Sequence, residues 1–249
     1  MSGKVAGRSR WIVASTVGAA LVSAGVVLLR ARRGSAQADE PADVAFMRAL
    51  HAALRRDLSR LRDVAGQLDS STGAPPTVLA GWDAFRAQLD NHHTAEDDDL
   101  WPVLRQELSD PGQLASVDAM VEEHRLIPPA LEAVDTALRG GGELTAPVES
   151  LSSVVLDHLA HEEREVLPLV ERYLTRAQWR AFLRTERARV SPRERPEFLT
   201  WVLDDASEQD AAVVLAEIPP PARLVYRRVL RPRYDAQRRW QLPGITAPA

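Results

Sequence analysis

The sequence contains no cysteine among its 249 residues. This absence excludes a disulfide scaffold, a thiol nucleophile, a zinc finger and a cysteine-ligated iron–sulfur cluster. The chain also has no glycine-rich phosphate loop and no nucleotide-binding fingerprint. Hydrophobic residues make up 45% and charged residues 27% of the chain, which is typical of a globular protein and excludes a wholly disordered chain or a polytopic membrane protein.

Lysine occurs only once, so 30 of the 31 basic residues are arginines, and charge is unevenly distributed. Residues 1–38 carry six basic groups and no acid, residues 39–170 carry a net charge of −15, and residues 171–249 carry +5. We expect a membrane anchor with its linker in residues 1–38, a helical bundle in residues 39–174, and a helical C-terminal extension packed on the bundle in residues 175–249. The arginines of the extension are mixed with acids, so we expect no nucleic-acid partner.

The segment Trp11–Leu29 is an uncharged run of 19 residues with arginines on both sides. As a helix it would be about 28 Å long, close to the thickness of a bilayer core. We therefore expect residues 11–29 to form a single-pass membrane anchor. A cleaved signal peptide ending near Ala36–Ala38 is the second interpretation, although three arginines precede that site. A helix buried in the protein is the third, and its basic flanks disfavour it. Three basic groups on each side leave the orientation undecided.

Clusters of turn-forming residues at 70–76, 110–112 and 140–142 divide residues 41–174 into four stretches. Within each stretch the apolar residues recur at steps of three and four, the period of one helix face, and none alternates with period two. Long helices joined by short turns pack antiparallel. The sequence therefore predicts an all-α fold, an up-down-up-down four-helix bundle with an N-terminal transmembrane helix and a helical C-terminal extension.

Each apolar face carries one histidine at a core position, and two faces add a glutamate one turn later: His51, His92, His124, His158, Glu96 and Glu162. Counting residues to each turn places the four histidines at one height in the bundle. A single such histidine is more often an ordinary core or surface residue, but four at one height are hard to obtain by accident. Buried charges are costly unless they are paired or bound to metal. Imidazole with carboxylate suits iron, and also zinc, copper or nickel, and two carboxylates suit a two-cation site.

The segments HHTAEDDDLWPVL (His92 to Leu104) and HLAHEEREVLPL (His158 to Leu169) resemble the two halves of the hemerythrin-like, or HHE cation-binding, domain. The lone His51 and His124 match the single histidines of the first and third helices. The resemblance covers about residues 41–174 and implies a four-helix bundle with two non-haem iron ions. It implies as metal ligands His51, His92, Glu96, His124, His158 and Glu162, with the two glutamates bridging the irons.

The oxygen carriers of this family use five histidines, and their third helix carries a second histidine one turn from the first. In this chain Met120 and Pro128 occupy the positions one turn from His124. His93 is a candidate replacement, but it points about 100° away from the His92 face. We expect His93 to lie beside the site or on the helix surface. A water or an open position is an equal alternative to His93 for completing the site, and open positions favour reactivity over simple carriage.

Other residues near these motifs are interpreted as structural. We expect His161 to lie beside the site or on the surface, and residues 97–99 to form a solvated acidic face. Pro102 and Pro168 follow the two glutamates and should bend or end their helices locally. The pair at residues 128–129 should do the same to the third helix.

These observations together predict a non-haem di-iron protein that binds dioxygen, nitric oxide or a similar small diatomic ligand for sensing or handling at a membrane. The alternatives are a di-iron enzyme acting on peroxide or oxygen, and iron storage. The absence of nucleotide and phosphate motifs favours binding, but it does not decide whether the chain is an enzyme.

Overall fold

The computed structural model describes residues 40–69, 73–191 and 193–243, and within these ranges the regular secondary structure is helical. The expectation of an all-α helical bundle is confirmed for this part of the chain. One isolated antiparallel bridge joins Pro41 to Thr175. The segment expected to anchor the chain, residues 11–29, lies outside the described residues. None of the described helices combines the length and the apolar character needed to cross a bilayer.

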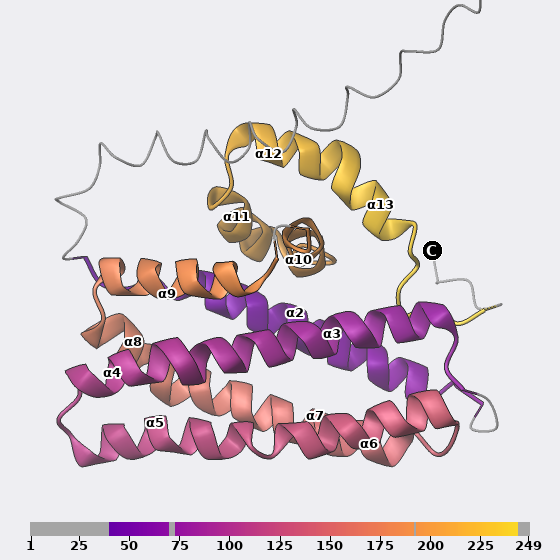
Figure 1. Cartoon of the computed structure of the whole chain (residues 1–249), viewed down its shortest axis with the longest axis horizontal. Coiled ribbons are helices and arrows are strands. Elements are labelled where there is room, and N and C mark those ends of the chain that lie inside the picture. The colour runs from indigo at the N-terminus through magenta and orange to yellow at the C-terminus, as the bar shows by residue number, and fades with distance from the viewer. Residues whose placement is uncertain (1–39, 70–72, 192, 244–249) are drawn as a thin grey trace, which may run out of the picture. The chain divides into compact units, whose positions relative to one another are not determined.

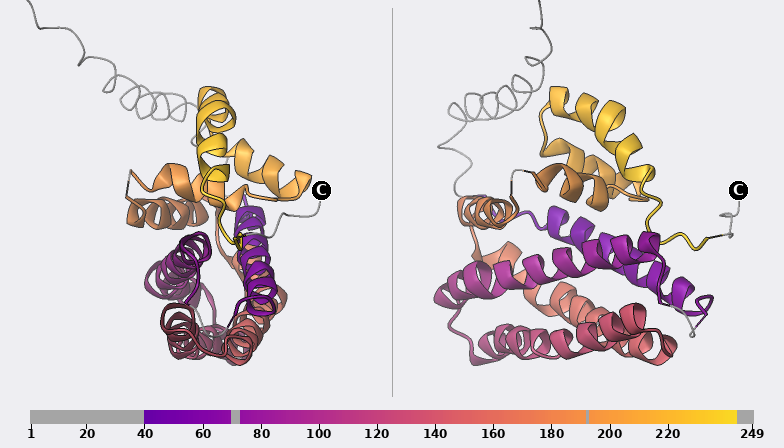
Figure 2. Two further views of the ribbon diagram at one scale, coloured as in Figure 1. Left: turned by 90° about the vertical axis from the view of Figure 1, so that its right-hand side faces the viewer. Right: turned by 45° about the vertical axis from the view of Figure 1, so that its right-hand side comes forward.

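Four helical rods form the bundle (Figures 1 and 2). The first is α2 (Ala45–Ala65), and the second comprises α3 (Pro76–Ala95), η1 (Glu96–Leu100) and α4 (Trp101–Glu107). The third comprises α5 (Pro111–His124) and α6 (Ile127–Gly140), and the fourth comprises α7 (Thr145–His161), η2 (Glu162–Val166) and α8 (Leu167–Tyr173). Their connections lie at alternate ends, so rods that follow one another in the chain run antiparallel (Figure 1).

Prolines shape three of the four rods. Pro102 and Pro168 lie in the first turn of α4 and α8, each directly after a π-helical turn, η1 or η2. A proline lacks the N–H of the helical ladder and clashes with the carbonyl four residues earlier, and a widened turn relieves both problems. The second and fourth rods therefore continue past their prolines. The third rod breaks between α5 and α6, where Pro128 lies in the first turn of α6.

The C-terminal extension adds further helices along one side of the bundle: α9 (Arg176–Arg189), α10 (Arg195–Val202), α11 (Glu208–Ala216), α12 (Pro220–Val225), η3 (Tyr226–Leu230) and α13 (Arg231–Asp235). Helix α9 packs on α3 and η1, and both α10 and α11 pack on α2. The indole Nε1 of the buried Trp201 donates a hydrogen bond of 2.7 Å to Oδ2 of the buried Asp57 on α2. Near the C-terminus, the indole ring of Trp240 lies against Gly81 of α3. The backbone N–H of Trp240 donates to the carbonyl of Thr77 at 3.0 Å.

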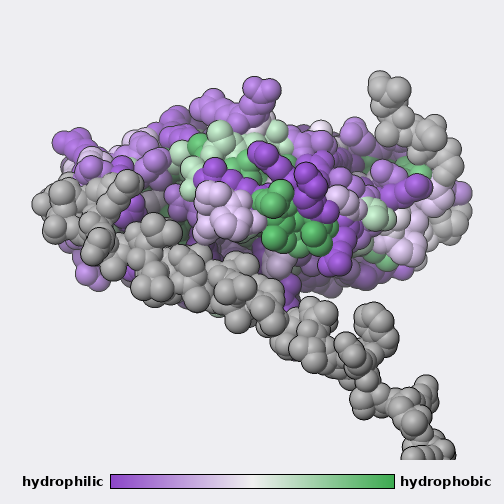
Figure 3. All heavy atoms as spheres, turned by 90° about the horizontal axis from the view of Figure 1, so that it is seen from above, coloured by the Kyte–Doolittle hydropathy of each residue, from purple (hydrophilic) through white to green (hydrophobic). Residues whose placement is uncertain are grey.

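Few large apolar side chains are exposed among the described residues. Of the four exposed large apolar side chains, Leu224, Val225 and Val229 lie on α12 and η3. Figure 3 shows the face of the molecule that carries the extension, with apolar atoms gathered among hydrophilic ones. The apolar residues that position the metal-site candidates belong instead to one continuous core shared by the bundle and the extension.

Candidate metal centre

The four rods bring seven polar side chains together inside this core. Their places in the helices follow from the spacing that the sequence shows, since each lies on the face that its apolar neighbours bury. None of the seven is more than 7% exposed: His51, His92, His93, Glu96, His124, His158 and Glu162. The structure thus brings together all six residues expected from the sequence and adds His93.

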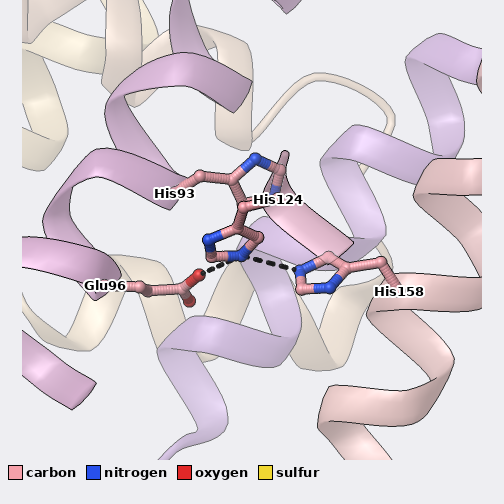
Figure 4. Close-up of side chains that lie close together, drawn as sticks. All are labelled: His93, Glu96, His124 and His158. Atoms are coloured by element: carbon pink, nitrogen blue, oxygen red, sulfur yellow. Dashed lines mark hydrogen bonds and ion pairs between the residues drawn. The ribbon is translucent and has the colours of Figure 1, made fainter. Parts of the chain in front are cut away.

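One group of possible metal ligands consists of His93, Glu96, His124 and His158, drawn in Figure 4. Each residue offers one ligand atom, and these atoms all lie within 4.8 Å of one another. Nε2 of His124 lies 3.2 Å from Nε2 of His158 and 3.5 Å from Oε2 of Glu96. The ring of His93 stacks on that of His124, with 4.2 Å between centroids. We call this set the three-histidine group.

A second group consists of His51, His92, Glu96 and Glu162, and the same 4.8 Å limit holds for its ligand atoms. Nε2 of His51 lies 3.1 Å from Nε2 of His92 and 3.2 Å from Oε2 of Glu162. Nε2 of His92 lies 3.4 Å from Oε1 of Glu96. We call this set the two-histidine group.

Glu96 belongs to both groups, with one oxygen toward His92 and the other toward His124. Its place in the sequence explains this position, because it follows His92 by four residues and His93 by three, and both spacings put side chains on a shared helix face. A carboxylate placed between two cation sites has the geometry of a bridging ligand. Glu162, to which the family resemblance assigns the same role, is found in the two-histidine group.

The expectation that His93 lies off to the side or on the surface is wrong, since it is buried and joins the three-histidine group. A rod in a four-helix bundle faces two neighbours, so its buried sector is wide enough for two adjacent residues. His92 points toward His51 of α2, and His93 points toward His124 of α5. The sequence signal was the doublet His-His before Glu96. The sequence analysis counted four ligand histidines, and the structure brings a fifth to the site.

Acidic side chains outside the two groups bind the other ring nitrogen of three histidines. The Nδ1–H of His51 donates to Oε1 of Glu163 at 2.8 Å, and that of His124 donates to Oδ1 of Asp97 at 2.9 Å. Such bonds fix the ring orientation and leave Nε2 free to bind a metal. Asp97 is therefore more than part of a solvated acidic face.

Glu123 of α5 links two histidines of α7. Its Oε2 accepts from Nδ1 of His158 at 2.9 Å, and its Oε1 accepts from Nδ1 of His161 at 2.6 Å. His161 is partly exposed and belongs to neither group. The interpretation of His161 as a residue beside the site therefore agrees with the structure.

The site is electrostatically unsatisfied when only protein atoms are counted. Burial lowers the pKa of His92 and of His93 well below the usual range, so both rings are neutral nitrogen donors. Burial and the neighbouring charge of Glu162 raise the pKa of Glu96 well above its usual range. Burial alone would raise the pKa of Glu162 too, but His51, His158 and His124 together outweigh burial and the pKa is lowered.

Several buried atoms of the site have no hydrogen-bond partner: both carboxylate oxygens of Glu96 and of Glu162, Nδ1 of His92 and Nε2 of His93. Buried polar atoms are nearly always hydrogen-bonded, so a cluster of exceptions requires an explanation. Cations would supply partners for the carboxylate oxygens, and imidazole nitrogen with carboxylate oxygen is a donor set that suits iron. The residues present therefore fit a pair of metal ions.

Comparison with protein families agrees with this geometry. The model of the hemerythrin HHE cation-binding domain matches residues 42–170, which is more than half of the chain and includes all seven residues of the two groups. The comparison with curated proteins and that with solved structures gave no match. On the family match and the buried His/Glu groups, the chain belongs to the hemerythrin family of HHE cation-binding proteins.

Proposed function

We propose that the two groups hold two non-haem iron ions and that this centre binds a small ligand such as dioxygen or nitric oxide. The observation that carries the proposal is the shared, buried Glu96, whose two oxygens face different groups and have no hydrogen-bond partner. When bound, an iron pair supplies reversible coordination and electron exchange with such a ligand. We include His93 among the proposed ligands, beside the six expected from the sequence.

The two groups differ in a way that bears on where a small ligand binds. The three-histidine group offers three imidazoles and Glu96, whereas the two-histidine group offers two imidazoles with Glu96 and Glu162. If Glu162 bridges, as the family resemblance implies, the three-histidine group has five protein donors and the two-histidine group has four. We infer that the two-histidine group is the side that accepts the ligand.

The surroundings favour a small ligand over a bulky substrate. Leu89 and Val155, each about one turn before a ligand histidine, are fully buried, so apolar layers exclude water from the site. Two pockets open on the described surface beside the end of the extension. None of the seven candidate metal-binding residues lines either pocket. This supports binding for sensing or handling ahead of chemistry on a large substrate. The placement at a membrane rests on residues 11–29 alone.

Iron content of the purified full-length chain tests the proposal. We expect about two irons per wild-type chain, since each group supplies four donors. Glu96→Ala removes a donor from both groups and should lower the content toward zero. Glu162→Ala removes the second carboxylate of the centre and should lower the content below two. Glu171→Ala, at an exposed position on α8, is the matched control and should retain about two.

Fewer than one iron per wild-type chain, or full occupancy in Glu162→Ala, would refute the di-iron proposal. Optical spectra of the iron-loaded protein, recorded with and without dioxygen or nitric oxide, then test ligand binding. An unchanged spectrum under both gases would leave a metal site without the proposed role.

A further inference from the structure

Helix α9 of the extension carries an acid on the face that it buries. Its buried residues are Trp179, Phe182 and Glu186, which recur at steps of three and four and therefore share one face. The two aromatic residues pack into the common core, and Glu186 continues the same stripe while only 6% exposed. An acidic residue thus occupies a position where the pattern calls for an apolar one.

Polar contacts at both ends of α9 fix where Glu186 lies along the bundle. Near the start of the helix, Nε2 of Gln178 donates to Oε1 of Glu107 at 2.8 Å, at the end of α4. At its last residue, Arg189 forms ion pairs of 3.0 Å with Asp98 and 2.7 Å with Asp99, both in η1. These contacts also correct the expectation that Asp98 and Asp99 form only a solvated face. The half of α9 that carries Glu186 therefore lies beside the π-helical turn that begins with Glu96.

The two-histidine group lies on the side of the bundle that the extension covers, because its histidines come from α2 and α3, the rods on which α9, α10 and α11 pack. Burial raises the pKa of Glu186 to about 7, against the opposing effects of Arg187 and His51. Its Oε1 is buried and has no hydrogen-bond partner.

Glu186 is not one of the donors that converge on either cation site. It lies beyond them, on the side of the bundle that α9 covers, and outside residues 42–170 that match the family. A buried carboxyl oxygen that lacks a partner and lies beside the turn carrying Glu96, without binding the metal, is available to hydrogen-bond whatever else the centre holds. This reasoning rests on the proposed function.

We propose that Glu186 is a ligand-binding residue supplied by the C-terminal extension, whose carboxyl donates a hydrogen bond to the small ligand held at the two-histidine group. The extension thereby completes the site on its open side. The chemical class recognised is a diatomic or small anionic ligand with a free acceptor atom.

Azide is a suitable probe of ligand binding to the iron-loaded full-length protein. The titration is carried out about one pH unit below the pKa of Glu186, so that its carboxyl is protonated and can donate. Glu186→Leu keeps the size of the side chain and removes the donor. We expect it to retain the wild-type iron content and to bind azide roughly tenfold more weakly, the loss of about one hydrogen bond. Glu186→Gln restores a donor and should bind within roughly threefold of wild type. Glu171→Leu on α8 is the matched control and should change nothing.

Equal azide affinity in wild type and Glu186→Leu would overturn the proposal, as would a glutamine variant as weak as the leucine variant. A second measurement uses the wild-type protein only, so its result does not depend on whether a variant folds. The infrared stretching frequency of bound azide should shift when the protein is transferred to D₂O, and an unshifted band would also overturn the proposal. If the wild-type protein did not bind iron, the proposed di-iron function itself would be refuted. Failure of the Glu186 proposal and failure of the di-iron function therefore give different results.

Discussion

Trp240 and Gly81 provide a sensitive test of how the extension is attached to the bundle. A Cβ added at Gly81 would lie 2.5 Å from two ring atoms of Trp240, a distance that such atoms do not tolerate. Gly81 lies inside α3, where alanine would otherwise be the better helix former. The substitution Gly81→Ala therefore has two opposing effects, and their sum depends on whether the indole is present.

The magnitudes follow from the burial of the indole. Trp240 is 8% exposed, and truncation of a buried tryptophan costs about 3 kcal/mol. Gly81→Ala displaces the ring and forfeits much of that packing, against a gain of about 1 kcal/mol in helix propensity. We expect a net destabilisation of about 2 kcal/mol in the wild-type background. In a Trp240→Ala background the clash is gone, so the same substitution should stabilise by about 1 kcal/mol.

Urea unfolding of wild type, the two single variants and the double variant measures this reversal of sign. The coupling between the two positions should be about 3 kcal/mol. If Gly81→Ala has the same sign in both backgrounds, Trp240 does not pack on α3 as described, and the attachment of the end of the extension would have to be reconsidered.

Two further predictions concern the acids that hold the histidine rings. Glu123→Ala leaves Nδ1 of His158 without its acceptor and should weaken iron binding by roughly 10- to 100-fold, measured by competition with a chelator; unchanged affinity would contradict the role given to this bond. Glu163 has a pKa lowered to about 2, because hydrogen bonds to His51 and Arg55 outweigh its burial. Its stabilisation should therefore be complete above the unfolded-state value near 4.5 and fade as pH falls toward 2. Glu163→Gln should cost about 1 kcal/mol at neutral pH, after discounting for solvent screening, and nothing near pH 2. A cost that does not change over this range in urea unfolding would show that the charge is not responsible.

The sequence was sufficient to predict the bundle and six of the seven residues that the structure brings together in the candidate site. Apolar periodicity gives each helix face, turn clusters give the ends, and counting from the turns sets relative height. The predicted common height of His51, His92, His124 and His158 matches the structure, where Nε2 atoms from different rods lie 3.1 and 3.2 Å apart. This works because antiparallel rods of regular helix keep a constant rise of about 1.5 Å per residue.

His93 shows where this reasoning fails. A single helix wheel assigns one inward direction to each rod, but a rod in a bundle has two neighbours and therefore two inward directions. The π-helical turns were missed for a different reason, since Pro102 and Pro168 indicate strain in the helix without indicating how the strain is relieved. Local sequence patterns report the face of a helix, and the identity of each neighbour comes only from the assembled fold.

Glu186 was missed because the apolar pattern of the extension is too short to determine which surface of the bundle α9 packs on. Its stripe of Trp179 and Phe182 shows that α9 buries one face, but several surfaces of the bundle were equally suitable for that face. The ion pairs of Arg189 with η1 decide the matter, and they join residues 90 and 91 positions apart in the sequence. Contacts of that range cannot be read from local spacing.

The charge distribution of the chain is consistent with the same arrangement. The bundle segment carries a net charge of −15, and a large excess of one sign destabilises a compact state through self-repulsion. Part of that excess lies at the centre, where Asp97, Glu123 and Glu163 bind histidine rings. The carboxylate oxygens of Glu96 and Glu162 have no hydrogen-bond partner there. Another part is offset by arginines of the extension, such as Arg189. Two bound cations would reduce the remaining excess at its most buried point. Metal binding should therefore stabilise the whole fold, and the extension should be held more firmly in the metal-loaded protein, because α9 packs on the turn that carries Glu96.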